Sequence, residues 1–438
     1  SRLVTSSRSS SSGSTVPPPV LTTPMREHQR YFPVYGPDGR LMPLFIGVHN
    51  GTAEHIDTIR AGNEKVLRAR LADARFFYLE DLKQPLAERV EQLKKIVFME
   101  ELGSLYDKTA RLEALAGYLA GVLGLDPDDK NRAVRAAHLC KADLVTSMVY
   151  EFPELEGVMG REYALQGGED PVVARAIYEH YLPRGAGDEL PETLPGKVLS
   201  LAEKADNLVG CFGLGIVPTG SQDPYALRRQ ALGMCRLLLE AGLHLDTGDL
   251  FRRAYRLYEG KLKIGEEELV TRLGEFVVQR LRGLFAERGL PADVVEAVLA
   301  ADAGDVRDAW ERARALAAFR HAPAFENLYT AFTRAHNLAK GAADGRIDPA
   351  LFEHPAESEL FGAYWETAAR AEPLLAARRY DEALEVMAAL RGPVDRFFDA
   401  VLVMTEDRAV RENRLALLRR VAGLVRKVAD LSRLVVVT

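Results

Sequence analysis

Histidine and carboxylate side chains on several expected helices are the residues of this sequence best suited to metal or acid–base chemistry. They are His138, His180, Glu203 and Asp206, which lie in three separate segments. Such side chains can converge on one metal ion when their helices pack together. Their spacing contains no compact ligand motif, and polar groups at the edges of amphipathic helices are the more common outcome of such a pattern.

Two neighbouring arginines, Arg228 and Arg229, are candidates for binding phosphate. They follow a turn at 220–225 and lie in the first turn of an expected helix. Their guanidinium groups can contact phosphate or pair with acids such as Asp223, and the sequence leaves both alternatives open. The glycine-rich stretch at 210–215 follows an expected helix and has no Gly-Lys-Ser/Thr step, so it is not a P-loop. Neither a Gly-x-Ser-x-Gly motif nor an ATP-site motif of a synthetase or kinase occurs, and together these observations indicate a chain without its own catalytic centre.

The C-terminal segment carries the strongest local charge. From Arg408 onward there are two acids, Glu412 and Asp430, and eight bases, namely Arg408, Arg411, Arg414, Arg419, Arg420, Arg426, Lys427 and Arg433. The local charge is about +6, whereas the whole chain has a formal net charge of −6. Apolar residues recur at helical spacing, namely Leu417, Val421, Leu424, Val428 and Leu431. Arg419, Arg426 and Arg433 recur every seven residues and lie roughly opposite this apolar stripe. We expect a helix that packs by its apolar face and offers arginines to solvent or to phosphates.

A mainly helical fold must position these residues. The turn residues 36–39 separate strand-like segments at 30–35 and 41–48, which predicts a β-hairpin, and apolar residues recur at helical spacing from residue 63 onward. The predicted organisation is a disordered Ser- and Pro-rich tail, tag or fusion segment (1–24), a β-hairpin region (25–62), a helical domain (63–225), its helical extension (226–318) and a terminal helical domain (319–438).

Composition narrows the class of protein. The 438 residues are 47% hydrophobic and 27% charged, as in ordinary soluble globular proteins. No stretch approaches the roughly 18 apolar residues that span a bilayer, so no membrane partner is expected. The three cysteines, Cys140, Cys211 and Cys235, lie far apart, which is typical of a reducing compartment and predicts a cytoplasmic protein. Because the net charge is negative, any binding of nucleic acid must rely on local positive charge.

Several long segments resemble the β subunit of the bacterial tetrameric glycyl-tRNA synthetase. They are the segments at 25–33, 62–74, 139–146, 151–160, 179–183, 218–229, 394–399 and 411–415. The resemblance extends from residue 25 to the C-terminus and implies the C-terminal portion of a longer subunit, with the Ser-rich start marking a cut or a fusion. It also implies a fold in which 63–225 form a degenerate HD-like helical domain and 319–438 a helical, DALR-like anticodon-binding domain.

The resemblance further implies partners and a division of labour. In this family the α subunit holds the active site that uses glycine and ATP with magnesium, and the β subunit recognises and positions tRNA-Gly in an α2β2 complex. This chain is then expected to hold no cofactor and no catalytic residue. Where an active HD domain has its His-Asp doublet, this sequence reads Cys140-Lys141. A lysine ammonium repels a divalent cation, so these positions, with His180 and Glu203, are expected to be vestigial and free of metal.

Residues that contact tRNA are also implied by the resemblance, because single-stranded anticodon bases are read by hydrogen bonds and by stacking. The candidates are Arg228, Arg229, Arg334, Asn337, Arg411, Asn413, Arg414, Arg419 and Arg426. As an alternative, Asn413 and Arg414 can pair within the domain with Asp395, Asp399 or Glu406. Two other functions remain open, an HD-family metal-dependent phosphohydrolase and a helical interaction scaffold without an RNA role.

Overall fold

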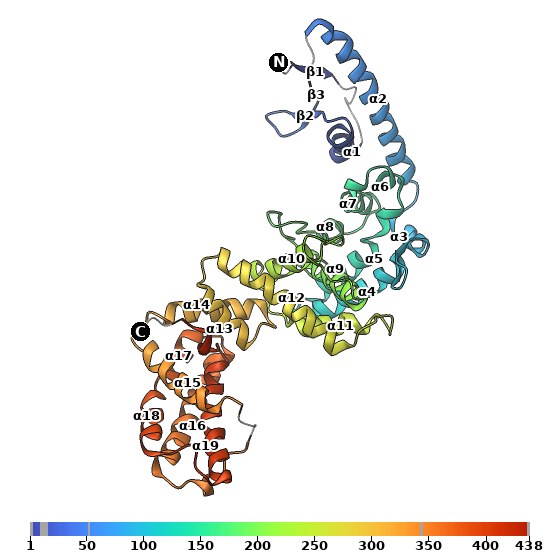
Figure 1. The fold of residues 1–438 in the computed structure, drawn as a ribbon. Coiled ribbons are helices and arrows are strands. Elements are labelled where there is room, and N and C mark those ends of the chain that lie inside the picture. Colours follow the sequence, from blue (N-terminus) through green and yellow to red (C-terminus); the bar gives the residue numbers. More distant parts are fainter. Residues whose placement is uncertain (1–2, 9–15, 51–52, 342–344, 436–438) are drawn as a thin grey trace. The chain divides into compact units, whose positions relative to one another are not determined.

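The computed structural model describes residues 3–8, 16–50, 53–341 and 345–435, and it is mainly α-helical there, as the sequence predicts (Figure 1). The chain forms two compact units. Unit 1 comprises Ser1–Gly233 with Arg253–Gly265, and unit 2 comprises Met234–Arg252 with Glu266–Thr438. The predicted domain boundaries stay predictions. No helix of the described residues is long and apolar enough to cross a bilayer.

Unit 1 begins with a small antiparallel sheet that confirms the predicted hairpin. The strand order is β1-β3-β2, with β1 at Leu3–Arg8, β2 at Phe32–Tyr35 and β3 at Leu41–His49. Gly39 has a φ of 73°, a conformation that glycine adopts without strain, and the Gly36 amide donates to the Arg40 carbonyl oxygen over 2.9 Å. Buried Phe45 packs with Met25 and Leu67, which joins the sheet to the long helix α2 (Ile56–Asp81).

The prediction of a disordered tail over 1–24 is wrong for residues 16–24. These residues include the helix α1 (Pro18–Thr23), which is followed by a π-helical turn, η1 (Pro24–His28). Val20 is fully buried and Leu21 nearly so, so this short apolar segment buries enough surface to be ordered. Residues 3–8 pair with β3, and residues 9–15 lie outside the described residues.

The rest of unit 1 is a helical bundle in which α9 is the central helix and contacts α4, α5 and α8. Side chains cap the starts of several helices, since Ser104 and Asp107 form a capping box on α4 and Thr193 caps α9. The elements are η2 (Ala53–His55), α3 (Leu86–Arg89), η3 (Val90–Lys95), β4 (Val97–Met99), β5 (Gly103–Ser104), α4 (Leu105–Val122), α5 (Pro127–Leu139), η4 (Ala142–Val145), α6 (Ser147–Glu151), η5 (Pro153–Leu155), α7 (Val158–Gln166), α8 (Pro171–Glu179) and α9 (Leu194–Gly213).

Unit 2 ends in a bundle in which the basic helix α19 packs on α15, α16 and α17. The predicted apolar stripe is confirmed, because all five of its residues are at most 2% exposed. The helix itself ends at Arg426 rather than continuing, and Val428 and Leu431 pack from the turn and η7 beyond it. The elements from α10 on are α10 (Leu227–Glu240), α11 (Thr247–Arg256), α12 (Glu266–Glu287), α13 (Ala292–Ala301), α14 (Val306–Phe319), α15 (Phe325–Ala339), η6 (Pro349–Leu351), α16 (Pro355–Ala376), α17 (Tyr380–Ala388), α18 (Arg391–Ala400), α19 (Arg408–Arg426) and η7 (Leu431–Arg433).

Candidate nucleic-acid interface

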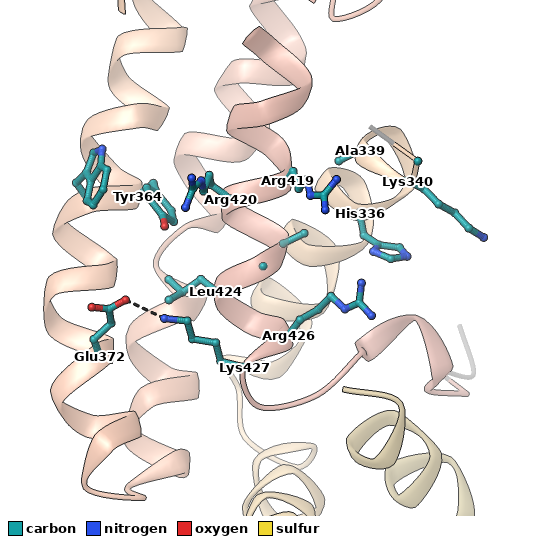
Figure 2. Close-up of a pocket in the computed structure, with 14 residues that line it drawn as sticks. His336, Ala339, Lys340, Tyr364, Glu372, Arg419, Arg420, Leu424, Arg426 and Lys427 are labelled. Atoms are coloured by element: carbon teal, nitrogen blue, oxygen red, sulfur yellow. Dashed lines mark hydrogen bonds and ion pairs between the residues drawn. The ribbon is translucent and has the colours of Figure 1, made fainter. Parts of the chain in front are cut away.

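A groove in unit 2 gathers positive side chains from helices that are far apart in the sequence (Figure 2). Its first part is a cavity of about 840 Å³ between α15, α16 and α19. A second hollow of about 520 Å³ shares the lining residues His336, Lys340 and Arg426 with the first, so the two adjoin. We call them together the basic groove. Its charged and polar lining residues are His336, Asn337, Lys340, Glu372, Arg419, Arg420, Arg426, Lys427, Asp430, Ser432 and Arg433.

Acidic residues neutralise only part of this charge. Lys427 donates to Glu372 over 2.8 Å, and Arg426 lies 3.6 Å from Asp430. Burial by itself would raise the pKa of Asp430, but hydrogen bonds from Ser432 and the positive charge of Arg426 hold it below its usual value. Asp430 is therefore a carboxylate at neutral pH, and the groove still has a positive excess.

Three exposed cations contribute most of that excess. The side chains of Lys340, Arg420 and Arg433 make no ion pair with any residue in the described part of the chain. Exposed cations that no carboxylate neutralises attract polyanions, and each one that contacts a phosphate releases a bound counterion. This arrangement suits the phosphates of a nucleic acid.

The structure brings three of the nine predicted RNA-contact residues to the basic groove, namely Asn337, Arg419 and Arg426. Arg334 instead hydrogen-bonds to Asp395, and its guanidinium carbon lies 4.6 Å from the centre of the Phe398 ring. Arg411 donates to the Thr405 carbonyl oxygen over 3.0 Å.

Asn413 and Arg414 are buried and bonded within unit 2. Arg414 donates to Glu357 and Glu353, in each case over 2.9 Å, and Asn413 bridges the backbone amide and carbonyl oxygen of Asp348. Pairing inside the domain was the predicted alternative for both residues, but the partners differ from the predicted ones. A structural role follows directly from these contacts, and contact with RNA stays a prediction.

Arg228 and Arg229 lie in unit 1 at the start of α10. Asp223 accepts hydrogen bonds from the backbone amides of Leu227 and Arg228, at 2.7 and 3.0 Å, so its carboxylate caps the helix rather than pairing with a guanidinium. Arg229 lines a small cavity of about 230 Å³ that Arg184 also lines. Contact between these arginines and phosphate stays a prediction.

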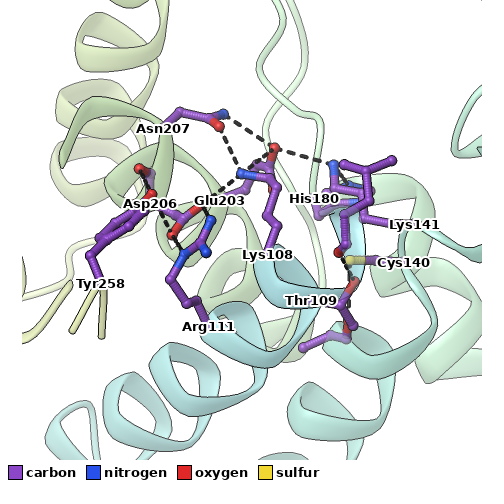
Figure 3. A network of polar contacts seen from close by, with 12 residues as sticks. Lys108, Thr109, Arg111, Cys140, Lys141, His180, Glu203, Asp206, Asn207 and Tyr258 are labelled. Carbon is purple, nitrogen blue, oxygen red and sulfur yellow. Dashed lines mark hydrogen bonds and ion pairs between the residues drawn. The ribbon is translucent and has the colours of Figure 1, made fainter. Parts of the chain in front are cut away.

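The residues predicted to be vestigial HD-like positions form a buried polar network in unit 1 (Figure 3). The Lys141 ammonium lies 2.9 Å from Nε2 of His180 and 3.1 Å from Oε1 of Glu203, and it stands 4.3 Å from the centre of the Tyr181 ring. Burial and the neighbouring ammonium lower the pKa of His180 well below its usual value. His180 is thus neutral, and it donates from Nδ1 to the Ile177 carbonyl oxygen and accepts from Lys141 at Nε2.

This network does not fit a divalent metal ion. The position among His180 and Glu203 already holds a cation, and burial raises the pKa of the neighbouring Cys140 thiol to about 12, so that it remains protonated. Over the described ranges, no group of three or more His, Cys, Asp or Glu side chains is arranged to hold a metal.

A metal-removal experiment follows from this network. We expect the thermal unfolding midpoint to change by less than about 1 °C on treatment with a chelator, because only a ligand that binds the folded state stabilises it. Differential scanning fluorimetry with and without the chelator, followed by addition of Zn²⁺ or Mn²⁺, measures this. A fall of several degrees that either metal restores would contradict the vestigial assignment.

Three residues that line the groove were not predicted from the sequence. Lys340 and Trp365 were not singled out, and Arg420 was only counted in the local charge, whereas Arg433 was predicted with Arg419 and Arg426 to lie opposite the apolar stripe. Trp365 lies on α16 and is 54% exposed. No sequence spacing relates it to the arginines of α19, so only the packing of the helices shows that they line the same groove.

Comparison with known proteins agrees with this architecture. Residues 11–300 match the family model described as glycyl-tRNA synthetase beta subunit, and residues 328–432 match the DALR anticodon binding domain. The chain is 61% identical over 418 residues to a protein named glycine--tRNA ligase beta subunit from Desulforudis audaxviator, which covers 95% of this chain and 61% of that protein. The protein of the same name from Clostridioides difficile is 47% identical over 420 residues, 96% of this chain and 61% of its own length. The chain thus spans about 61% of the length of these relatives.

Proposed function

Because the chain belongs to the glycyl-tRNA synthetase β-subunit family, we propose that it is a non-catalytic, tRNA-binding portion of a glycine–tRNA ligase. The ligase would be an α2β2 complex in the cytoplasm. Its α subunit would use ATP with magnesium and glycine to charge tRNA-Gly. The chain described here would bind and position that tRNA. The observation that carries the proposal is the basic groove, which lies in the unit that contains the match to an anticodon-binding domain.

The charge distribution supports RNA as the partner. Lys340, Arg420 and Arg433 come from three different parts of unit 2, and they line the two adjoining hollows of the basic groove. A phosphate backbone can meet several of these cations at once, which a single carboxylate on a protein partner cannot. The groove therefore favours RNA binding over a scaffold without an RNA role.

The buried network of unit 1 argues against the phosphohydrolase alternative. Hydrolysis of a phosphate ester by such a centre needs a metal ion to polarise the phosphoryl oxygen and activate water. Lys141 places an ammonium between His180 and Glu203, which are the side chains that a metal would need.

Glycylation and binding assays test the proposal together. We expect no glycylation of tRNA-Gly by this chain with glycine, ATP and Mg²⁺, and glycylation when purified α subunit and full-length β subunit are combined. In filter binding, affinity of the chain for tRNA-Gly should fall roughly 10³-fold between 50 and 200 mM salt if about six phosphates are neutralised.

Each assay has its own result that would contradict the proposal. Glycylation by the chain alone would contradict its non-catalytic role. Absence of any affinity for tRNA-Gly, even with the α subunit present, would contradict tRNA binding and favour the scaffold. Phosphatase turnover with stoichiometric bound metal would instead support the phosphohydrolase.

A further inference from the structure

An exposed aromatic side chain also lines the basic groove. Trp365 lines the larger cavity and is 54% exposed, although neighbouring rings hold it in place. Tyr364 meets it at a centroid distance of 5.3 Å and an angle of 67°, and Phe361 at 6.1 Å and 82°. Both contacts are edge-to-face arrangements. Trp365 therefore contacts two neighbouring rings and keeps about half of its surface exposed to solvent.

Positively charged side chains line the same cavity as Trp365. Arg419, Arg420 and Arg426 line the same cavity from α19, and Lys340 lines it from the C-terminal end of α15 (Figure 2). The volume of about 840 Å³ lies within the range of about 300–1,000 Å³ that small-ligand sites occupy. An aromatic surface beside several cations is the combination that proteins use to bind single-stranded nucleic acid.

We propose that the basic groove binds an unstacked nucleotide of RNA, with its base stacked on Trp365 and its flanking phosphates on the cations of α15 and α19. This inference rests on the proposed function, because it takes RNA as the partner. Every base has a π-face, so stacking supplies affinity with little discrimination between bases. Trp365 is accordingly a positioning residue, and base identity is read by other groups such as the Asn337 amide in the adjoining hollow.

The chain offers a direct readout because it contains two tryptophans, Trp310 and Trp365. Trp310 packs against Phe285 at 5.2 Å and does not line the groove. A Trp310→Phe variant of the whole chain leaves Trp365 as the fluorescent reporter. A Trp365→Phe variant, which retains Trp310, is the matched control.

Four probes separate the possible ligands. They are the anticodon stem-loop of tRNA-Gly, the same RNA with abasic loop positions, a blunt RNA duplex of equal charge, and ATP. We expect the stem-loop to quench Trp365 emission with the same concentration dependence as its binding, and the abasic RNA and the duplex to leave it unquenched. The Trp365→Phe control should show no quenching with any of the four.

Affinity measurements complete the test. We expect Trp365→Ala to weaken binding of the stem-loop about 5- to 100-fold, and Trp365→Phe to restore most of that loss. The dependence of affinity on salt should stay unchanged in both variants, because no charge is removed. Replacing individual loop bases should change the quenching of Trp365 little, because stacking tolerates any base.

The contrary outcomes are distinct. Tight, salt-dependent binding of the stem-loop without quenching, or with unchanged affinity of Trp365→Ala, would overturn the stacking site and leave the proposed function intact. Quenching by ATP as strong as by the stem-loop would overturn RNA as the source of the nucleotide. Absence of binding by any RNA would defeat the proposed function itself. If Trp365→Ala fails to fold, the fluorescence of the Trp310→Phe variant still decides.

Discussion

Replacing Arg414 by alanine is expected to lower the free energy of unfolding by about 3–5 kcal/mol. Arg414 is 5% exposed, and its guanidinium bonds to Glu357, whose side chain is fully buried. Without Arg414 the Glu357 carboxylate would lie buried with no cation beside it. Chemical denaturation of the variant and of the unchanged chain, followed by circular dichroism, measures the difference.

The pH dependence gives this prediction a second readout. Burial tends to raise the pKa of Glu357, but the hydrogen bond from Arg414 and backbone amides hold it below its usual value. A carboxyl with a depressed pKa in the folded state stabilises the fold above its unfolded pKa and loses that contribution as the pH falls through the folded value. Stability of the unchanged chain should therefore decline below about pH 4.

Removal of Arg414 should reverse the direction of the Glu357 shift. The unpaired buried carboxylate of the Arg414→Ala variant would bind a proton at higher pH, so its stability deficit should be smaller at pH 5 than at pH 7. The matched control is Arg408→Ala on the same helix, where the Arg408 side chain is 82% exposed and pairs with Glu412. We expect it to change stability by less than about 0.5 kcal/mol. Equal effects of the two substitutions would refute the buried role of Arg414.

The second large effect concerns RNA affinity. A triple variant with Lys340→Ala, Arg420→Ala and Arg433→Ala removes the cations of the basic groove that form no ion pair with described residues. If each one contacts a phosphate, affinity for tRNA-Gly at 0.1 M salt should fall by about 10²- to 10³-fold. These side chains are exposed, so stability should change little. Filter binding at fixed salt measures the loss.

A matched control removes the same charge elsewhere. Arg68, Lys130 and Arg314 are exposed, lie outside the basic groove and form no ion pair with described residues. Their triple replacement by alanine should leave affinity within about threefold of the unchanged chain, because only long-range attraction is lost. An equal loss in both triple variants would mean that total charge, and not the groove, governs binding.

Local patterns in the sequence predicted the elements whose cause is local. The Gly-Pro-Asp-Gly turn at 36–39 predicted the hairpin, and the apolar spacing from Leu417 to Leu431 predicted which face of α19 is buried. The end of α19 at Arg426 was not predicted. The Asp430 amide donates to the Ala297 carbonyl oxygen over 2.8 Å, so a contact with another helix sets the path of the chain beyond α19.

The site was predicted only in part, because some of its features depend on local sequence patterns and others on contacts between distant segments. Arg419 and Arg426 were found from their heptad spacing, which a single helix determines. The partners of Arg414 were not predicted, because Glu353 and Glu357 precede it by about sixty residues in the sequence. They contact Arg414 only when α16 packs on α19. Trp365 lines the groove through the same packing. Long-range contacts that build a cavity leave no fixed spacing in the sequence.

The dependence of tRNA-Gly affinity on salt tests the central claim most directly. The slope of log affinity against log salt counts the phosphates that the protein neutralises. For the variant that lacks Lys340, Arg420 and Arg433, we expect a slope smaller in magnitude by about two to three than that of the unchanged chain. The control variant at Arg68, Lys130 and Arg314 should keep the original slope. An unchanged slope in the groove variant would contradict the assignment of the basic groove as the RNA-binding surface.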